Sequence, residues 1–197
     1  MRKIWLISGC LFASMAFGQE TKKEPLGFGI TVSFPWVNQY YFYDYQTAKD
    51  ASKAGFVGLG AALFLGNEKR KFSINAGLTG DLPVPIGPMD FAKEGDRASI
   101  STNFIEGLYH HNLGGRFNII GGANFTYYNY NYINYDTDTS YQQHDHTLGL
   151  TLGTEYRFTR VFSLAFFYRP ALIMLNQPQY RHLFSLDARF DINFSRN

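Results

Sequence analysis

The feature that most constrains this chain is the alternation of apolar and polar side chains over long segments. It is clearest over residues 182–194, HLFSLDARFDINF. A β-strand turns successive side chains to opposite faces. From Phe184 onward, one face of this segment is therefore almost wholly apolar, and the other carries Asp187, Arg189 and Asp191. Segments of this kind predict strands that separate an apolar surface from a polar one.

The same alternation recurs along the chain and predicts eight strands, at 26–36, 55–65, 71–82, 99–109, 116–128, 146–158, 161–173 and 182–194. The segments between them alternate between long and short. Residues 37–53, 83–98 and 129–145 are polar or rich in Pro, Gly, Tyr and Asn, and they predict loops. An up-and-down barrel with both termini at one end has short turns at that end and longer loops at the other.

Composition decides which face of these strands points inward. Aromatic residues make up 18% of the chain and charged residues only 17%, below the roughly 25% of soluble domains. The polar face carries glycine, serine, threonine and asparagine, where a soluble barrel would expose many lysines and glutamates. Small polar residues suit the interior of a narrow eight-stranded barrel. The apolar face is therefore predicted to point outward.

Charged residues on the polar faces predict a cluster inside the barrel, formed by Glu155, Arg157, Arg169, Asp187, Arg189 and Asp191. Side chains just fill the interior of eight strands, which favours a closed polar core over a solute path. The segment 99–109 is an exception, because Glu106 shares a face with Phe104 and Leu108. A carboxylate facing lipid is costly. We therefore expect a bulge near Asn103, or a position of Glu106 at the membrane rim.

The N-terminus predicts a cleaved secretory signal peptide over residues 1–18. Arg2 and Lys3 precede an apolar run that is too short to span a bilayer, and Ala16-Phe17-Gly18 fits a small-x-small cleavage site. Ile7-Ser8-Gly9-Cys10 resembles a lipobox, so a lipidated Cys10 is the alternative. The domain boundaries that follow are a signal peptide, a lead, a barrel and a tail, at 1–18, 19–25, 26–194 and 195–197.

Cleavage after residue 18 changes the charge and the cysteine content of the chain. It removes the only cysteine, so the mature protein has neither a disulfide nor thiol chemistry. It also removes Arg2 and Lys3, which leaves equal numbers of basic and acidic residues. A chain without a basic patch is not expected to bind nucleic acid.

With a signal peptide, eight alternating segments and an aromatic residue, Phe194, near its end, the chain resembles the small eight-stranded outer-membrane barrels of Gram-negative bacteria, the OmpA-barrel and OmpX-like class. The resemblance covers 26–194 and departs from the class in the three residues after Phe194. It implies an all-β, eight-stranded antiparallel up-and-down transmembrane β-barrel, exported to the outer membrane. It also implies a monomer that contacts outer-membrane lipid and lipopolysaccharide.

Members of this class act as anchors, adhesins, solute- or lipid-handling proteins and occasionally lipid-modifying enzymes. Tyrosines in the predicted loops favour recognition, because tyrosine offers rigid amphipathic contact area for a protein or glycan ligand. They are Tyr40, Tyr41, Tyr43, Tyr45, Tyr130, Tyr132, Tyr135 and Tyr141. The alternative is an aromatic girdle at the lipid headgroups.

We expect a non-enzymatic scaffold that displays these loops in adhesion, envelope stability or a larger complex. A small solute channel or solute- or lipid-binding barrel is the alternative, and a lipid-modifying enzyme comes third.

One histidine-rich segment offers candidate metal ligands. His144-Asp145-His146, with Asp136 and Asp138 nearby, offers imidazole and carboxylate groups of the kind that bind zinc. The spacing matches no established zinc site. We expect neither a metal nor a cofactor.

Two groups of side chains are candidate catalytic sites. The first combines Ser140 and Asp145 with His144 or His146, and the second pairs Ser185 with His182. Neither reproduces a catalytic motif, and nearness in sequence does not establish the geometry of a triad. The sequence therefore predicts no enzymatic activity and no catalytic residue.

Overall fold

The computed structural model describes residues 26–44, 48–67, 69–81, 96–134, 136–175 and 180–194, and every regular element in these ranges is a β-strand. The predicted signal peptide, lead and C-terminal tail lie outside the described residues, and the described chain begins at Leu26, the first residue of the predicted barrel. The strands are β1 Gly27–Asp44, β2 Lys49–Gly55, β3 Val57–Gly66, β4 Arg70–Gly80, β5 Asp96–Gly114, β6 Phe117–Asn134, β7 Thr139–Arg157, β8 Phe162–Met174 and β9 Tyr180–Asn193.

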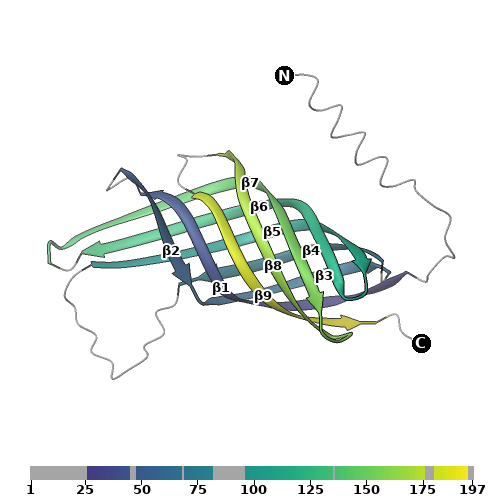
Figure 1. Cartoon of the computed structure of the whole chain (residues 1–197). Coiled ribbons are helices and arrows are strands. Elements are labelled where there is room, and N and C mark those ends of the chain that lie inside the picture. The colour runs from purple at the N-terminus through teal and green to yellow at the C-terminus, as the bar shows by residue number, and fades with distance from the viewer. Residues whose placement is uncertain are drawn as a thin grey trace, which may run out of the picture.

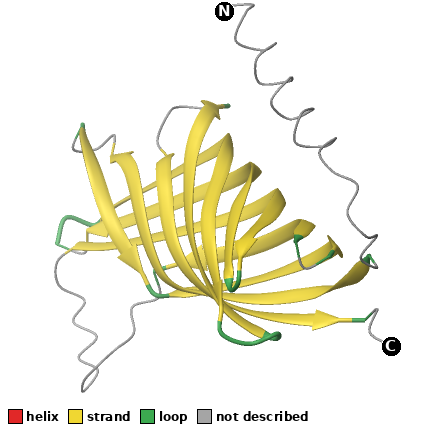
Figure 2. Ribbon diagram, turned by 45° about the vertical axis from the view of Figure 1, so that its right-hand side comes forward, coloured by secondary structure: helices red, strands yellow, loops and turns green. Residues whose placement is uncertain are grey.

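The strands form a closed antiparallel barrel, as predicted. Each strand from β3 to β8 pairs with the next in sequence, and β9 pairs with β1 to close the ring (Figure 1). β2 and β3 both pair with β1, β2 along 38–44 and β3 along 27–33, so they occupy successive parts of one position in an eight-membered ring. Figure 2 shows the strands coiling around a common axis.

The two ends of the barrel differ. The turn end holds the start of β1, the end of β9 and the short connections at 67–69, 115–116 and 158–161. The loop end holds the connections between β1 and β2, β4 and β5, β6 and β7, and β8 and β9. In Figure 1 the turn end lies on the right, on the side of the C mark.

Two of the three predicted long loops are mostly strand, which corrects the sequence analysis. The predicted loop 37–53 forms the second half of β1 and most of β2. The predicted loop 129–145 extends β6 and β7, which form a hairpin that pairs from Phe117↔Tyr156 to Asn134↔Thr139. The pairing of β7 with β8 ends at Thr147↔Met174, so the β6–β7 hairpin projects beyond β8 at the loop end. Most of the predicted loop 83–98 lies outside the described residues, and β5 begins at Asp96.

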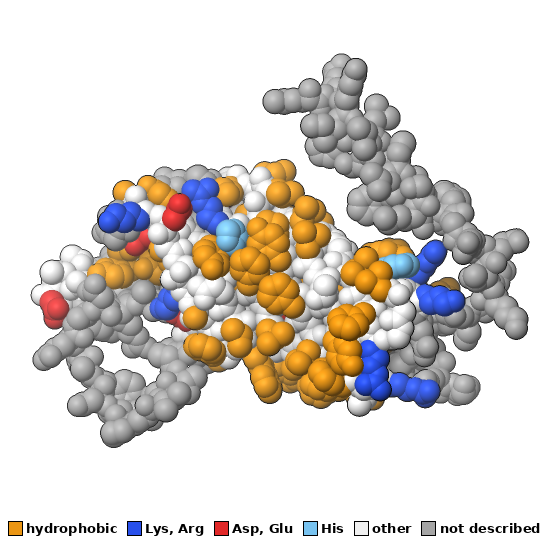
Figure 3. Space-filling view, in the orientation of Figure 1, with side chains coloured by type: hydrophobic (Ala, Val, Ile, Leu, Met, Phe, Trp, Pro, Cys, Tyr) orange, Lys and Arg blue, Asp and Glu red, His pale blue; other side chains and the backbone are white. Residues whose placement is uncertain are grey.

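The exterior of the barrel is apolar, as the composition predicted. Large aliphatic and aromatic side chains such as Leu63, Ile74 and Phe125 are exposed, whereas their neighbours in sequence are buried inside. Hydrophobic side chains gather over the middle of the barrel in Figure 3, with charged side chains nearer the two ends. A surface of this kind is stable only against lipid or another apolar phase. The described residues include no helix that is long and apolar enough to cross a membrane.

A bulge in β1 changes which residues face inward. The pairing of β1 with β9 shifts register between Pro35 and Val37, and both Trp36 and Val37 are exposed on the outer surface. Below the bulge, Thr31 points inward, and above it the even-numbered residues Asn38, Tyr40, Phe42 and Asp44 do so. Two-versus-one pairing at a β-bulge has this effect.

The prediction for residues 99–109 was wrong. β5 pairs with β4 and β6 without a register shift until Asn112, so no bulge occurs near Asn103, and the face predicted to point outward points inward. Its members, Ile100, Thr102, Phe104, Glu106 and Leu108, are all buried. Ile105 and Tyr109 lie on the outer face instead. Glu106 therefore lies inside the barrel, away from lipid and from the rim.

Candidate functional site

A buried ion pair lies inside the barrel. The guanidinium of Arg169 on β8 donates from Nε to Oε2 of Glu106 over 3.0 Å, and from Nη2 to Oε1 over 3.1 Å. Both side chains are about 1% exposed. This is a bidentate charge-assisted pair, the strongest common form of hydrogen bonding between side chains.

Other buried groups complete the hydrogen bonding of this pair. Glu106 also accepts from the Thr151 hydroxyl at 2.8 Å and from Nδ2 of Asn75 at 3.2 Å. Arg169 donates from Nη1 to the Ser185 hydroxyl at 2.6 Å, and its guanidinium carbon lies 4.5 Å from the ring centre of Phe104. A charge taken out of water is tolerated when its remaining lone pairs and protons are satisfied in this way. Arg169 and Glu106 thereby link β4, β5, β7, β8 and β9.

A second polar cluster lies toward the turn end. Glu155 accepts hydrogen bonds from Asn118 Nδ2 at 2.6 Å and from the Ser163 hydroxyl at 2.8 Å, and Arg189 Nη1 lies 3.5 Å from its Oε1. Nearby, Lys71 Nζ donates to Asp191 at 2.9 Å. Oppositely charged groups are thus matched across the barrel from β4, β7 and β9.

The structure places the predicted interior cluster as follows. Glu155, Arg169, Asp187 and Arg189 are buried inside the barrel. Arg157 and Asp191 lie at the turn end and remain partly exposed. Sequence analysis missed the two partners Glu106 and Lys71. A signal for Lys71 was available, because it shares an alternating face with Ser73 and Asn75, which lie inside.

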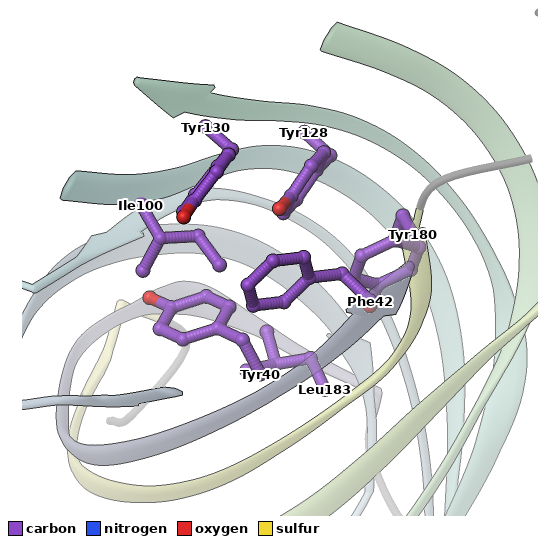
Figure 4. Close-up of a cluster of buried hydrophobic side chains, with 7 residues drawn as sticks. All are labelled: Tyr40, Phe42, Ile100, Tyr128, Tyr130, Tyr180 and Leu183. Carbon is purple, nitrogen blue, oxygen red and sulfur yellow. The ribbon is translucent and has the colours of Figure 1, made fainter. Parts of the chain in front are cut away.

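An aromatic layer fills the barrel toward the loop end. Figure 4 shows its side chains converging from β1, β5, β6 and β9. The members are Tyr40, Phe42, Ile100, Tyr128, Tyr130, Tyr180 and Leu183. Tyr40 donates its hydroxyl hydrogen to Thr79 at 2.7 Å, and Tyr180 donates to the backbone oxygen of Arg169 at 3.0 Å. This layer therefore contacts the ion-pair network directly.

The loop-end tyrosines divide into buried and accessible groups. Tyr40 and Tyr130 belong to the buried aromatic layer, so among the described inward-facing tyrosines of the predicted loops Tyr132 and Tyr141 are the partly accessible ones. These two rings stack with their centroids 4.9 Å apart, and the Tyr141 hydroxyl donates to Asp44 at 3.0 Å. Tyr41 and Tyr43 point to the outer surface, and the rings of Tyr41 and His182 pack with their centroids 4.6 Å apart. Tyr45 and Tyr135 lie outside the described residues.

The structure does not bring either candidate catalytic group together. His144 and His146 point outward from β7, whereas Asp145 between them is buried inside the barrel. Ser185 is likewise buried inside, bonded to Arg169, while His182 packs against Tyr41 on the outer surface. Within the described ranges, no three His, Cys, Asp or Glu side chains are placed to hold a metal ion.

Comparison with known proteins identifies the fold. No family model matches the sequence, and no curated protein matches it. Among solved structures, Ail, the attachment invasion locus protein of Yersinia pestis, superposes with a TM-score of 0.59 at 10% sequence identity, covering 86% of this chain and 100% of Ail. Neisserial surface protein A superposes with a TM-score of 0.51 at 12% identity, covering 87% of this chain and 100% of that one. The chain therefore has the fold of the small eight-stranded outer-membrane β-barrels.

Proposed function

We propose that this protein is an integral outer-membrane barrel that acts as a non-enzymatic scaffold and presents its loop end to a ligand outside the cell. The observation that carries the proposal is the β6–β7 hairpin, which continues beyond the end of β8 and bears accessible tyrosines. A strand built only to cross the membrane would end where the apolar belt ends. The extra length provides a surface outside the membrane.

The filled interior supports a scaffold over a solute channel. Eight strands leave little room inside, and here that room holds the Glu106–Arg169 pair with the aromatic layer above it. A solute would have to displace buried side chains that are hydrogen-bonded across the barrel. This arrangement suits a rigid support for the projecting strands.

The charges of the loop end bear on the kind of ligand. A solved structure of Ail contains the heparin analogue sucrose octasulfate, a polyanion. By analogy we propose an external ligand for this chain, but of different charge. Asp44 lies at the accessible tyrosine Tyr141, and Asp136 and Asp138 lie on the hairpin that carries it, whereas the loop-end cations Lys53 and Arg181 lie against Asp81 and Asp50. Acidic and tyrosine side chains together favour neutral or cationic partners over a sulfated one.

The test combines location, folding and binding. The protein should fractionate with outer membranes and change its electrophoretic mobility on boiling, as folded transmembrane barrels do. Cells that display it should then bind neutral glycans or cationic proteins on an array more strongly than heparin. Replacing Tyr132 and Tyr141 with alanine should abolish that binding, whereas replacing the outward-facing Tyr43 should preserve it. A soluble protein, preferential heparin binding or steady conductance in planar bilayers would each contradict the proposal.

A further inference from the structure

One tyrosine and one glutamine inside the loop end have buried polar atoms that no neighbouring group satisfies. Tyr128 is 0% exposed and Gln143 is 7% exposed. Neither the Tyr128 hydroxyl nor the side-chain oxygen of Gln143 has a hydrogen-bond partner in the part of the chain that the structure describes. By contrast, Tyr40 and Tyr180 in the same aromatic layer each donate a hydrogen bond. Native proteins keep few unsatisfied polar atoms because they cost free energy, so these two point to a partner from outside the chain.

The pairing of β6 with β7 places the two residues next to each other. Tyr128 lies opposite Asp145, and Gln143 lies opposite Tyr130, two residues further toward the loop end. All four side chains are buried inside the barrel. Figure 4 shows the hydroxyl groups of Tyr128 and Tyr130 directed toward the middle of the aromatic layer. Diagonal neighbours on one face of an antiparallel pair are about 7–8 Å apart, so one small group can contact both Tyr128 and Gln143.

Aromatic rings lie beside this position. Phe42 on β1 packs against Tyr128 and Tyr130, with ring centroids 5.8 and 4.9 Å apart. Tyr141 packs against Tyr130 with their centroids 6.0 Å apart. The face of an aromatic ring carries partial negative charge and attracts a cation. Rings around an unsatisfied oxygen therefore favour a positively charged group over a negatively charged one.

The charges of the hairpin also favour a cation. Residues 129–146 contain Asp136, Asp138 and Asp145 and neither lysine nor arginine. Asp145 is 0% exposed and lies directly opposite Tyr128, so its carboxyl group is at the depth of the two unsatisfied atoms. Attraction between opposite charges is stronger in the protein interior than in water, because the effective dielectric constant is lower there.

The chemistry of Gln143 narrows the kind of cation. Its side-chain oxygen only accepts hydrogen bonds, so the bound group must donate. A primary ammonium group has three N–H donors on one compact charge. These donors match the amide oxygen of Gln143, the hydroxyl oxygen of Tyr128 and the carboxyl group of Asp145. A quaternary ammonium group has no N–H donor and would leave Gln143 unsatisfied.

An alkyl chain can connect this position with the outside. Tyr132 and Tyr141 lie opposite each other one step nearer the loop end, where both are partly accessible and their rings stack. From Tyr141 to Gln143 the strand advances by two residues, or roughly 7 Å. This length is comparable to the four-carbon stem of a lysine side chain. A linear amine with its ammonium group at Gln143 would therefore place its alkyl chain against the accessible tyrosines.

We propose that the inner face of the β6–β7 hairpin binds a primary ammonium group on a linear alkyl chain, with Gln143 and Tyr128 as its hydrogen-bond partners. The inference rests on the proposed function, because it names the chemical group of the external ligand that the loop end recognises. A lysine side chain of a protein ligand and a free aliphatic amine share this chemistry.

The test is an NMR titration of the folded full chain in detergent micelles with pentylammonium, at constant pH and ionic strength. Wild-type protein should bind it saturably, with shifts at Gln143 and Tyr128, and at least about tenfold more tightly than pentanol, which has the same alkyl chain without the charge. Tetramethylammonium should also bind more weakly. Gln143→Leu and Tyr128→Phe should each weaken binding by about tenfold, because each removes one hydrogen bond to a charged group.

Adjacent positions supply matched controls. Gln142→Leu and Tyr127→Phe change the same amino acids one position away, on the outer face of the hairpin, and should leave the affinity for pentylammonium unchanged. Without the amine, Gln143→Leu and Tyr128→Phe should unfold in urea no earlier than wild type, because the atoms they remove have no partner in the chain. The shift on boiling should show that every variant is folded.

Two results would overturn the proposal: equal affinities for pentylammonium and pentanol, and an unchanged affinity for pentylammonium in both interior variants. Competing peptides identify the source of the ammonium group. Displacement by a lysine peptide but not by its norleucine counterpart would indicate a protein side chain, and displacement by free amines alone would indicate a small molecule. A protein that keeps its array ligand but does not bind pentylammonium would overturn this inference and leave the proposed function intact. A folded protein that binds pentylammonium but no array ligand would instead contradict the proposed function.

Discussion

Arg169 and Glu106 face each other inside the barrel with two hydrogen bonds, of 3.0 and 3.1 Å, between them. Their strands, β8 and β5, are not neighbours in the ring, so the pair spans the interior. Each residue would leave a buried, unpaired charge if the other were removed. The interior is therefore sensitive to single substitutions here and tolerant of a paired replacement.

The first prediction concerns this pair. Glu106→Gln should lower the free energy of unfolding by about 3–5 kcal/mol, because it removes the carboxylate that is hydrogen-bonded to the buried Arg169 guanidinium. The double variant Glu106→Leu with Arg169→Met should recover most of the loss. Urea unfolding in lipid vesicles, followed through the fluorescence of the lipid-facing Trp36, measures both. Ser185→Ala, which removes one neutral partner of Arg169, should cost only about 1 kcal/mol. An equal effect of Ser185→Ala and Glu106→Gln would contradict this assignment.

The second prediction concerns Asn38, just above the bulge in β1. Its side-chain amide donates to the backbone oxygens of Pro35 at 3.2 Å and Val57 at 3.4 Å. The amide thus donates hydrogen bonds to two backbone carbonyls at the point where the pairing of β1 with β2 and β3 is interrupted. Asn38→Leu should destabilise the barrel by about 1–3 kcal/mol in the same unfolding experiment. Gln39→Leu, at the next position on the outward face, should change stability by less. A larger loss of stability in Gln39→Leu than in Asn38→Leu would show that the two backbone carbonyls need no side-chain partner.

The third prediction compares two adjacent glycines on β6. A Cβ atom at Gly122 would overlap the backbone oxygen of Gly107 and lie 2.9 Å from the Leu108 side chain, whereas one at Gly121 would meet nothing within 4 Å. Gly122→Ala should therefore cost about 1–3 kcal/mol through overpacking. Gly121→Ala should be neutral or slightly stabilising, because alanine restricts the unfolded chain. Equal effects of the two substitutions on the urea midpoint would show that β5 and β6 separate freely.

The fourth prediction concerns alkaline pH. Burial and the hydrogen bond to Asp44 raise the pKa of the Tyr141 phenol above its usual value, and burial also raises the pKa of Tyr130. A group whose pKa is raised in the folded state contributes stability that is complete below its unfolded pKa of about 10 and is lost as the pH rises above it. The β6–β7 hairpin should therefore loosen at strongly alkaline pH. Tyrosinate absorbance should show late-titrating phenols, one fewer in Tyr141→Phe, and an unchanged titration in that variant would contradict the assignment.

The sequence allowed the membrane-crossing part of the fold to be predicted because lipid imposes a pattern on it. On β9, Phe184, Leu186 and Phe190 face the outer surface, and alternation alone predicted the inner Asp187 and Arg189. Beyond the belt no lipid contacts the strands, so the alternation disappears. For this reason the extended parts of β1, β6 and β7 were predicted as loops.

The central site was harder to predict because it depends on contacts between distant residues. In β5 both faces carry apolar residues, such as Phe104 inside and Ile105 outside, so hydrophobicity did not distinguish them. The residue that decides the orientation is Arg169, which is 63 positions from Glu106 in sequence. Which side chains of β1 point inward likewise depends on the bulge at Trp36, and it is the pairing with β9 that shows this bulge.

The bulge at Trp36 divides β1 into two parts: odd-numbered side chains point inward before it, and even-numbered side chains point inward after it. If Trp36 were paired opposite Leu186 and did not bulge, the upper half of the strand would shift by one position against β9, so that Tyr40 and Phe42 would turn outward while Gln39 and Tyr41 entered the barrel. Deleting Trp36 would instead remove the extra residue and leave Val37 opposite Leu186, with Tyr40 and Phe42 still inside. In variants of this chain, loss of a residue at position 36 should therefore be tolerated better than the gain of one.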